Sequence, residues 1–241
     1  KLKNITNQFL IKGSDPIVAI SGGIDSITLS TFISKEIKKR LNVAHAVSPA
    51  VSVEATNRVK DLSKRYNWKL HILNAEEMRD KNYTSNPINR CFYCKTNLYY
   101  SISSTLNGQI LSGANLDDLN DFRPGLKAAE NSSVRHPFIE SQMGKKEIRA
   151  LANQLGLKEI SKLPASPCLS SRIQTGIYIT SDLLNKIDRV ERKIKIMVPE
   201  ADVRCRWLNK GITIEFNEPS LEQINDKYKT QIINFTEEIF K

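Results

Sequence analysis

Residues 21–26 read Ser-Gly-Gly-Ile-Asp-Ser, a pattern suited to holding a phosphate group. The apolar run Ile17–Ile20 comes directly before them and is short enough for a buried strand of a parallel sheet. Asp25 and Ser26 then open a helical pattern that runs through Arg40. A strand, a glycine turn and a helix N-terminus in this order present backbone N–H groups to an anion.

The individual residues of this turn also suit the binding of a nucleotide. Gly22 and Gly23 let the backbone approach a phosphate without a Cβ in the way. Ser21 and Ser26 can add hydroxyl donors, and Asp25 can reach a Mg²⁺ ion that neutralises the phosphates. The turn has neither the Gly-Lys-Ser/Thr ending of a Walker A loop nor the three-glycine spacing of a Rossmann fingerprint. Taken alone, the six residues could also form an ordinary strand-to-helix turn.

Cysteines form the second set of residues that could bind a metal or take part in a reaction. Cys91 and Cys94 have the Cys-x-x-Cys spacing of metal ligands, and Cys168 follows two prolines, Pro164 and Pro167, that exclude a regular helix. Three thiolates leave one metal position open, which suits a catalytic iron–sulfur cluster or a zinc site with an exogenous ligand. A Cys-x-x-Cys pair can also be a redox pair or purely structural. Cys205 lies in an alternating strand pattern and is expected to be a packed residue.

Carboxylates form a third group, just after an expected strand. Asp117, Asp118 and Asp121 lie close together in the sequence, beside Arg123 and a Pro-Gly turn. These groups could hold Mg²⁺ or position a cationic substrate. The alternative is a solvated acidic turn in which an aspartate caps the next helix.

The elements that must position these residues alternate between strands and helices. Expected strands are 17–20, 43–47, 68–73 and 109–112, expected helices are 25–40, 52–66, 91–104 and 144–156, and 82–90 is expected to be a loop. This alternation predicts an α/β fold with a doubly wound parallel sheet. Ligands of such sheets lie beyond the carboxyl ends of the strands, so the glycine turn and Gly113 should line one crevice.

The pattern changes after Gly176. A charged helix over 181–198, two strands over 203–208 and 212–216, and a helical stretch after Pro219 predict a small α+β domain. We therefore expect two domains, residues 1–176 and 177–241.

Composition and charge indicate which partners and which location to expect. The 241 residues carry a formal charge of +10, which suits phosphate-rich partners, and 40% are hydrophobic. No apolar stretch is long enough to span a bilayer and no signal-peptide pattern opens the chain, so we expect a cytoplasmic location and no membrane partner. Basic runs are not interleaved with aromatic residues, so nucleic acid is not expected as a partner.

Several segments resemble known motifs. Residues 21–26 resemble the SGGxDS PP-loop of the ATP pyrophosphatases. Residues 113–125 resemble the GxNxDDxxDxRPG block of the LarE-type ATP-dependent sulfur transferases. Residues 146–157 look like the KxxIR…LGL helix of that family, and 164–173 are similar to its PxSxCLxSRI loop. The resemblance runs from about residue 15 to residue 206, with the motifs in order.

The resemblance implies an enzyme with the adenine nucleotide alpha-hydrolase-like PP-loop fold that uses ATP and Mg²⁺. Such enzymes help to make the nickel-pincer nucleotide cofactor: they adenylate a carboxylate of pyridinium biscarboxylate mononucleotide and replace its oxygen with sulfur. In one branch the sulfur comes from the loop cysteine, here Cys168. In another branch three cysteines, here Cys91, Cys94 and Cys168, bind a 4Fe–4S cluster that carries an exchangeable sulfide. This chain resembles the cluster-bearing branch.

The resemblance also assigns roles to particular residues. The expected catalytic residues are Cys168, Asp25 and Arg172. Those expected at ATP and pyrophosphate are Ser21, Gly22, Gly23, Asp25, Ser26 and Gly113, and those expected at the substrate or Mg²⁺ are Asp117, Asp118, Asp121 and Arg123. The expected partners are a nucleotide-like small molecule, sulfide or a sulfur donor protein, and further copies of the chain in a homo-oligomer.

Two other functions remain open from the sequence. A tRNA-thiolating PP-loop enzyme would also use the basic charge and a cluster, but the chain shows no zinc-ribbon cysteine pairs. A non-catalytic adenine-nucleotide-binding protein would explain the glycine turn. It would leave the three cysteines and the segment from Asp117 to Arg123 without a use.

Overall fold

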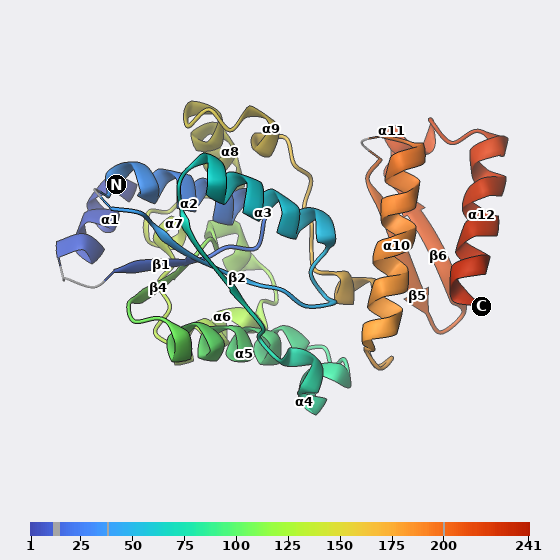
Figure 1. Cartoon of the computed structure of the whole chain (residues 1–241), viewed down its shortest axis with the longest axis horizontal. Coiled ribbons are helices and arrows are strands. Elements are labelled where there is room, and N and C mark those ends of the chain that lie inside the picture. The colour runs from blue at the N-terminus through green and yellow to red at the C-terminus, as the bar shows by residue number, and fades with distance from the viewer. Residues whose placement is uncertain (12–14, 38, 200) are drawn as a thin grey trace.

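A four-stranded parallel sheet forms the centre of the larger part of the molecule (Figure 1). The computed structural model describes residues 1–11, 15–37, 39–199 and 201–241. The strands are β1 (Pro16–Ala19), β2 (Asn42–Ala46), β3 (Lys69–Leu73) and β4 (Gln109–Ser112), in the order β3-β2-β1-β4. The chain moves outward from β1 to β3 and then returns to the other side of β1. The strand order therefore reverses between β1 and β4, the position at which α/β sheets bind ligands.

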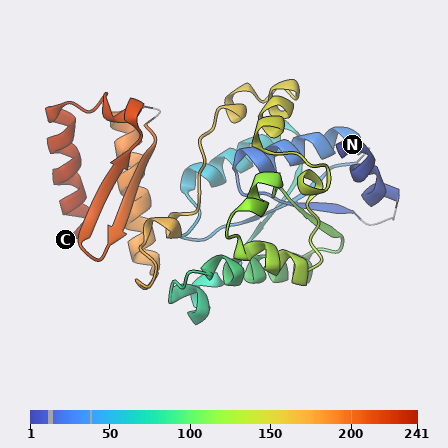
Figure 2. The same ribbon diagram turned by 180° about the vertical axis from the view of Figure 1, so that it is seen from behind.

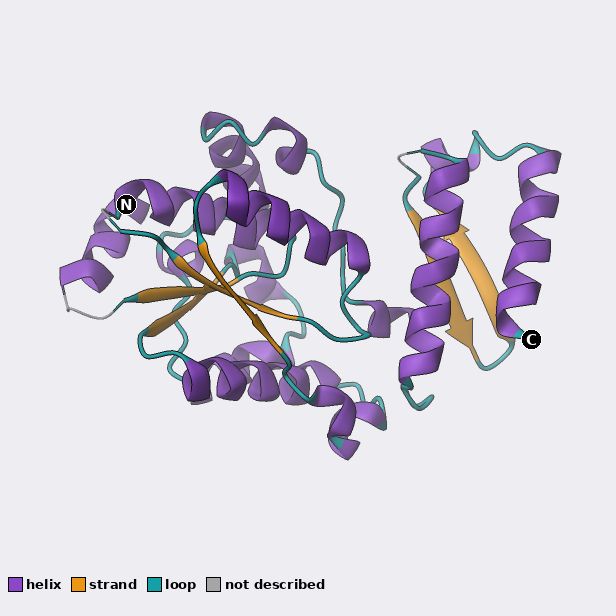
Figure 3. Ribbon diagram, in the orientation of Figure 1, coloured by secondary structure: helices purple, strands orange, loops and turns teal. Residues whose placement is uncertain are grey.

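Helices cover both faces of this sheet (Figures 1 and 3). One face carries α2 (Ile24–Glu36), α3 (Val53–Arg65) and α8 (Lys145–Gln154), and the other carries α5 (Arg90–Thr105) and α6 (Pro124–Asn131). The remaining short helices of this part are α1 (Leu2–Ile11), α4 (Lys81–Thr84), α7 (Pro137–Glu140) and α9 (Lys158–Ser161). The expected α/β architecture with a parallel sheet is confirmed.

Successive strand residues face opposite sides of the sheet, and both sides are apolar. Val18 and Leu111 belong to the core that contains Ile27 of α2. Their neighbours Ile17 and Ile110 belong to a separate core on the α5 side. Burial on both faces explains why β1 reads as a continuous apolar run rather than as an alternating pattern.

The C-terminal part contains a two-stranded antiparallel sheet and two long helices (Figure 2). Its elements are α10 (Ser181–Met197), β5 (Val203–Leu208), β6 (Gly211–Phe216), α11 (Glu218–Leu221) and α12 (Asp226–Phe240). Seen from behind, the hairpin lies in front of α10 and α12, which cover one of its faces. No helix in the described ranges has both the length and the apolar character needed to cross a bilayer.

The core of this C-terminal part does not begin at residue 176. Its buried residues include some from earlier in the chain: Ala50, Tyr83, Leu169 and Ile173. Backbone hydrogen bonds tie Gly176 to the carbonyl of Asn86 (2.9 Å) and Ile179 to the carbonyl of Thr84 (2.8 Å). The Asn86 side-chain amide donates to the carbonyls of residues 174 and 177 (both 2.9 Å). The expected division into domains 1–176 and 177–241 stays a prediction, but the two parts share a core.

Two expected element boundaries are wrong. The helix expected over 25–40 ends at Glu36, because Ile37 adopts an extended conformation (φ −100°, ψ 145°), and Lys38 lies outside the described residues. The loop expected over 82–90 begins with three residues of α4. Asp80 caps that helix by accepting from the backbone N–H of Asn82 (2.9 Å). The sequence did not indicate this cap, because Asp80 lies among other polar residues.

His45 fixes the end of β1 immediately before the glycine turn. Its Nδ1 lies 2.8 Å from the carbonyl oxygen of Ile20, and its Nε2 lies 3.0 Å from the Thr56 hydroxyl of α3. A carbonyl can only accept, so Nδ1 carries the proton and the Thr56 hydroxyl donates to Nε2. Burial lowers the pKa of His45, and the hydrogen bond to Ile20 opposes this shift. The folded protein therefore favours the neutral imidazole.

This arrangement predicts a pH-dependent stability. The unfolded chain protonates His45 near its ordinary pKa of about 6.5, whereas the folded chain resists protonation. The free energy of unfolding should therefore fall as pH falls below about 6.5, until the pKa of the folded state is passed. Urea unfolding at several pH values should show a smaller decrease for His45→Asn than for the parent. Burial also lowers the pKa of the partly exposed His71, so His71→Asn should reduce the decrease less than His45→Asn does. Equal pH dependence in His45→Asn and the parent would contradict this assignment.

Candidate active site

The two glycines of the turn after β1 have different structural roles. Gly22 has φ +87°, and a Cβ there would lie 2.8 Å from the carbonyl oxygen of Ala55. Gly23 has φ −86° and ψ 164°, and a Cβ there would come no closer than 3.7 Å to the Ser21 hydroxyl. Gly22 is therefore required by the turn itself. Gly23 leaves open space at the start of α2, where no side chain caps the helix.

Ser26 ties the two ends of the turn together. Its hydroxyl accepts from the backbone N–H of Ser21 (3.1 Å) and donates to the carbonyl of Gly23 (3.2 Å). Ser26 is buried, whereas Ser21 is exposed. Ser26 therefore maintains the turn, and the Ser21 hydroxyl is the one that can reach a ligand.

Arg58 of α3 holds the turn from the other side, and the sequence did not single it out. Its guanidinium donates to the carbonyl of Gly22 (2.8 Å) and pairs with Glu54 (2.5 Å). It is one of several basic residues on α3, and only the fold shows which of them faces the turn.

Gly113 brings the end of β4 against the start of α2. A Cβ at this position would lie 2.8 Å from the backbone nitrogen of Ser26. The close approach of two backbones explains the glycine and places the segment after β4 beside the glycine turn.

Asp25 is paired with a lysine that the sequence motifs did not single out. Lys145 Nζ lies 2.6 Å from both carboxylate oxygens of Asp25, and the Lys145 backbone N–H donates to Asp117 (2.7 Å). Burial raises the pKa of Asp25, the nearby Asp118 charge adds to the rise, and Lys145 opposes it. The first residue of α8 thus connects the glycine turn with the acidic segment. Only this contact distinguishes Lys145 from the adjacent Lys146.

The acidic segment divides into two parts. Asp118 accepts from the backbone N–H of Asn115 (3.0 Å) and so stabilises the start of the 3-10 turn Leu116–Asn120 in which it lies. The N-cap of the next helix, α6, is Arg123, which makes no side-chain capping hydrogen bond, so the expected aspartate cap of that helix is not found there. Arg123 pairs with both Asp118 and Asp121 (3.1 Å each). Asp117, Asp121 and Arg123 are all exposed, and Asp117 contacts Lys145. The structure therefore places Asp117 and Asp118 near Asp25, whereas Asp121 pairs with Arg123 at the surface.

Cys91, Cys94 and Cys168 lie close enough for their charges to interact. Cys91 and Cys94 are in the first turns of α5, Cys168 is exposed before a short 3-10 turn, and all three are free thiols. Burial raises the pKa of Cys91, and it raises the pKa of Cys94 to about 12. A thiolate at Cys168 adds to both shifts. The nearby charge of Lys95 opposes both shifts in pKa.

Within the described ranges, no three His, Cys, Asp or Glu side chains are close enough to hold a metal ion. The choice between an iron–sulfur cluster and a zinc ion stays as the sequence left it. The cluster and the Mg²⁺ ion stay predictions.

One pocket joins the glycine turn to the Cys168 loop. Ser21, Gly22 and Gly23 line it, and so do Pro167 and Cys168, around a volume of about 160 Å³. Cys168 therefore faces the pocket of the glycine turn and also lies within electrostatic reach of Cys91 and Cys94.

Arg172 holds the Cys168 loop in place. It forms a buried ion pair with Glu191 of α10 (2.9 and 3.2 Å) and donates to the carbonyl of Pro167 (2.9 Å). Glu191 also accepts from the backbone N–H of Cys205 (2.9 Å). The guanidinium is thus committed to the loop and to the C-terminal part, and its expected catalytic role stays a prediction.

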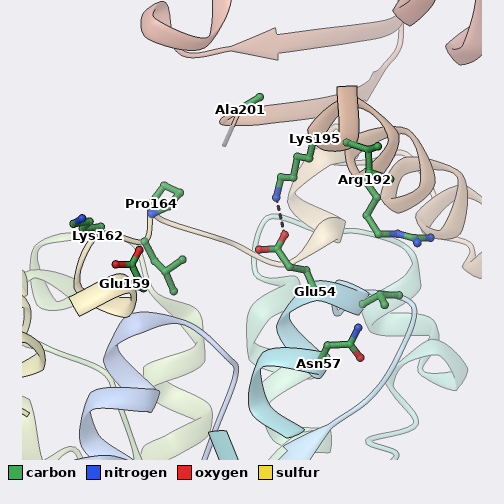
Figure 4. Close-up of a pocket in the computed structure, with 11 residues that line it drawn as sticks. Glu54, Asn57, Glu159, Lys162, Pro164, Arg192, Lys195 and Ala201 are labelled. Atoms are coloured by element: carbon green, nitrogen blue, oxygen red, sulfur yellow. Dashed lines mark hydrogen bonds and ion pairs between the residues drawn. The ribbon is translucent and has the colours of Figure 1, made fainter. Parts of the chain in front are cut away.

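A larger pocket of about 820 Å³ adjoins the first one, between α3, the segment after α9 and α10 (Figure 4). Glu54 of α3 and Lys195 of α10 point toward each other across it, 2.8 Å apart. Both residues also line the smaller pocket, as do Pro164 and Arg192. The two pockets therefore meet at this ion pair.

Substitution of the glycines should separate the roles of the turn. Gly22→Ala should lower the free energy of unfolding by about 1–3 kcal/mol, because alanine resists positive φ and its Cβ would meet Ala55. Gly23→Ala should keep the parent stability but weaken ATP binding by at least about tenfold, because its Cβ occupies the space at the start of α2. Urea unfolding and calorimetric ATP titration measure the two effects. Parent-like ATP affinity in Gly23→Ala would rule out a phosphate cradle.

Substitution of Arg172 should separate a positioning role from a catalytic one. Arg172→Met leaves the buried Glu191 carboxylate without its cation, which should cost about 3–5 kcal/mol of stability. The double variant Arg172→Met, Glu191→Met removes both charges and should recover part of that loss. If Arg172→Met kept the parent stability and lost only turnover, the positioning role would be wrong.

Comparison with known proteins gives three relatives, and no protein-family model matches the chain. The chain is 34% identical over 198 residues to the uncharacterized protein slr1717 of Synechocystis sp. PCC 6803, covering 79% of this chain and 72% of the relative. It is 30% identical over 231 residues to the uncharacterized protein MJ0830 of Methanocaldococcus jannaschii, covering 94% and 87%. It is 29% identical over 224 residues to the pyridinium-3,5-bisthiocarboxylic acid mononucleotide synthase of Lactiplantibacillus plantarum, covering 89% and 80%.

Proposed function

The chain belongs to the family that contains slr1717 and MJ0830, and on this premise we propose that it is an ATP-dependent sulfur transferase with the PP-loop fold. The observation that carries the proposal is the single pocket shared by the glycine turn and Cys168. A phosphate-binding turn and a thiol on one pocket suit an activation by ATP that is followed by attack of sulfur. The name of the Lactiplantibacillus plantarum relative, a bisthiocarboxylic acid mononucleotide synthase, supports an acceptor of the pyridinium biscarboxylate mononucleotide class.

The first proposed step is adenylation of the acceptor. A carboxylate oxygen of the acceptor attacks the α-phosphorus of ATP, the bond to the β-phosphate oxygen breaks, and pyrophosphate leaves. The uncapped N–H groups at the start of α2 and the Ser21 hydroxyl would stabilise the departing charge. Asp25 and Asp117 would hold the Mg²⁺ ion, which neutralises the phosphates, and Lys145 lies between these two carboxylates.

The second proposed step inserts sulfur into the activated carboxyl group. A sulfur nucleophile attacks the carbonyl carbon, and AMP leaves with the electron pair of the broken C–O bond. The sulfur atom is either that of Cys168 itself or an exchangeable sulfide. In the first case a base removes the Cα proton of Cys168 and its Cβ–S bond breaks, which releases the thiocarboxylate and leaves dehydroalanine. Cys91, Cys94 and Cys168 would hold a 4Fe–4S cluster, which would supply such a sulfide when bound. The three thiols lie close enough for their charges to interact, which supports a shared site for them.

Substitution of individual cysteines tests both steps. Under anaerobic conditions, with iron, sulfide, ATP and pyridinium biscarboxylate mononucleotide, the parent should release pyrophosphate and form a thiocarboxylate. Cys168→Ala should keep acceptor-dependent pyrophosphate release and lose thiocarboxylate formation. Cys205→Ala, which changes a buried thiol of β5, should keep both. The parent should also bind about four irons, and Cys91→Ala and Cys94→Ala should lose them.

The result also identifies the source of the sulfur. A single turnover in iron-free protein, with dehydroalanine found at position 168 by mass spectrometry, would establish the sacrificial mechanism. Absence of acceptor-dependent pyrophosphate release in the parent, or unchanged thiocarboxylate formation in Cys168→Ala, would contradict the proposed function.

A further inference from the structure

The ion pair between Glu54 and Lys195 connects two distant helices but adds little to the stability of the protein. It joins the first turn of α3 to the last turn of α10, residues 141 positions apart in the chain. Both side chains are about two-fifths exposed or more, at 47% and 38%. Ion pairs with this exposure add little to stability, so Lys195 can exchange its partner at low cost.

A continuous line of contacts connects Lys195 to the glycine turn. Arg58 donates to the carbonyl of Gly22, and Arg58 pairs with Glu54, which in turn pairs with Lys195. Glu54 therefore holds two cations beside the turn that receives phosphate. Burial alone would raise the pKa of Glu54, but Lys195 and Arg58 lower it overall, so Glu54 is a carboxylate at neutral pH.

The positive charges at this place come from two different parts of the molecule. Arg58 belongs to the α/β part, and Arg192 and Lys195 belong to α10, yet all three line the pocket of the glycine turn. Each is held by a carboxylate, Arg192 by Asp188 (2.7 Å) and the other two by Glu54. An anion with several charges competes well against a single carboxylate for such cations.

The larger pocket gives such an anion a route away from the turn. It includes the Glu54–Lys195 pair and lies between α10 and the segment that contains Lys162, with a volume of about 820 Å³ (Figure 4). Inorganic pyrophosphate, a product of the proposed reaction, combines high negative charge with small size.

We propose that the region where the two pockets meet is a binding subsite for inorganic pyrophosphate, with Lys195 as its principal cation and Glu54 as the group that pyrophosphate displaces. The subsite rests on the proposed function, because pyrophosphate arises there from ATP. It assigns the C-terminal part a direct contact with a product of the nucleotide site.

Calorimetric titration of the full chain with pyrophosphate and Mg²⁺ tests the subsite. Lys195→Met should weaken pyrophosphate binding by about tenfold, because one charge-assisted contact is lost. Glu54→Gln should strengthen it by about threefold or more, because Lys195 and Arg58 lose their competing carboxylate. Lys186→Met, on the same helix and paired with Asp182 within it, should leave the affinity unchanged.

The opposite signs separate a ligand role from a structural role. If Glu54 and Lys195 only joined α3 to α10, both variants would weaken binding, and that result would overturn the subsite. Parent-like affinity in Lys195→Met, or absence of pyrophosphate binding by the parent, would overturn it as well. The titration requires neither acceptor nor sulfur source, so these failures leave acceptor-dependent ATP cleavage by the parent as a separate test of the proposed function.

Discussion

The left-handed turn at Gly22 is the constraint on which the rest of the site depends. Its positive φ allows the backbone to pass the carbonyl of Ala55 and to place Gly23 at the open start of α2. Three contacts define its surroundings: His45 holds the preceding Ile20, Arg58 holds the Gly22 carbonyl, and Ser26 closes the turn from within. Since β2, α3 and α2 each supply one contact, the turn forms only when this part of the sheet and its helices are assembled.

The Cys168 loop depends on a different kind of restraint. Its prolines prevent helix formation, and the buried pair between Arg172 and Glu191 attaches it to α10. Cys205 enters the same contact through its backbone N–H. The thiol that faces the pocket of the glycine turn is therefore positioned by the C-terminal part, although the loop precedes residue 176. The C-terminal part thus shapes this pocket through the loop as well as through its own side chains, such as Arg192 and Lys195.

Local patterns predicted most of the fold. The strand over 109–112 and the helix over 52–66 were expected from the sequence, because apolar runs and helical spacing act over a few positions. The partners of the site were not predictable in the same way. Lys145 pairs with Asp25 across 120 residues, and Glu54 pairs with Lys195 across 141. In a chain with 36 basic residues, composition does not indicate which lysine lies beside which carboxylate.

Hydrogen bonds of Asn86 hold the connection between the α/β part and the C-terminal part in place. Its side-chain amide donates to carbonyls of the segment that leads into α10, and its backbone carbonyl accepts from Gly176. The connection between the two parts is therefore fixed by hydrogen bonds. The apolar core also continues across it, from Tyr83 to Ile179. A protein built in this way should behave as one cooperative unit of folding, in which separating the halves would expose apolar surface on both.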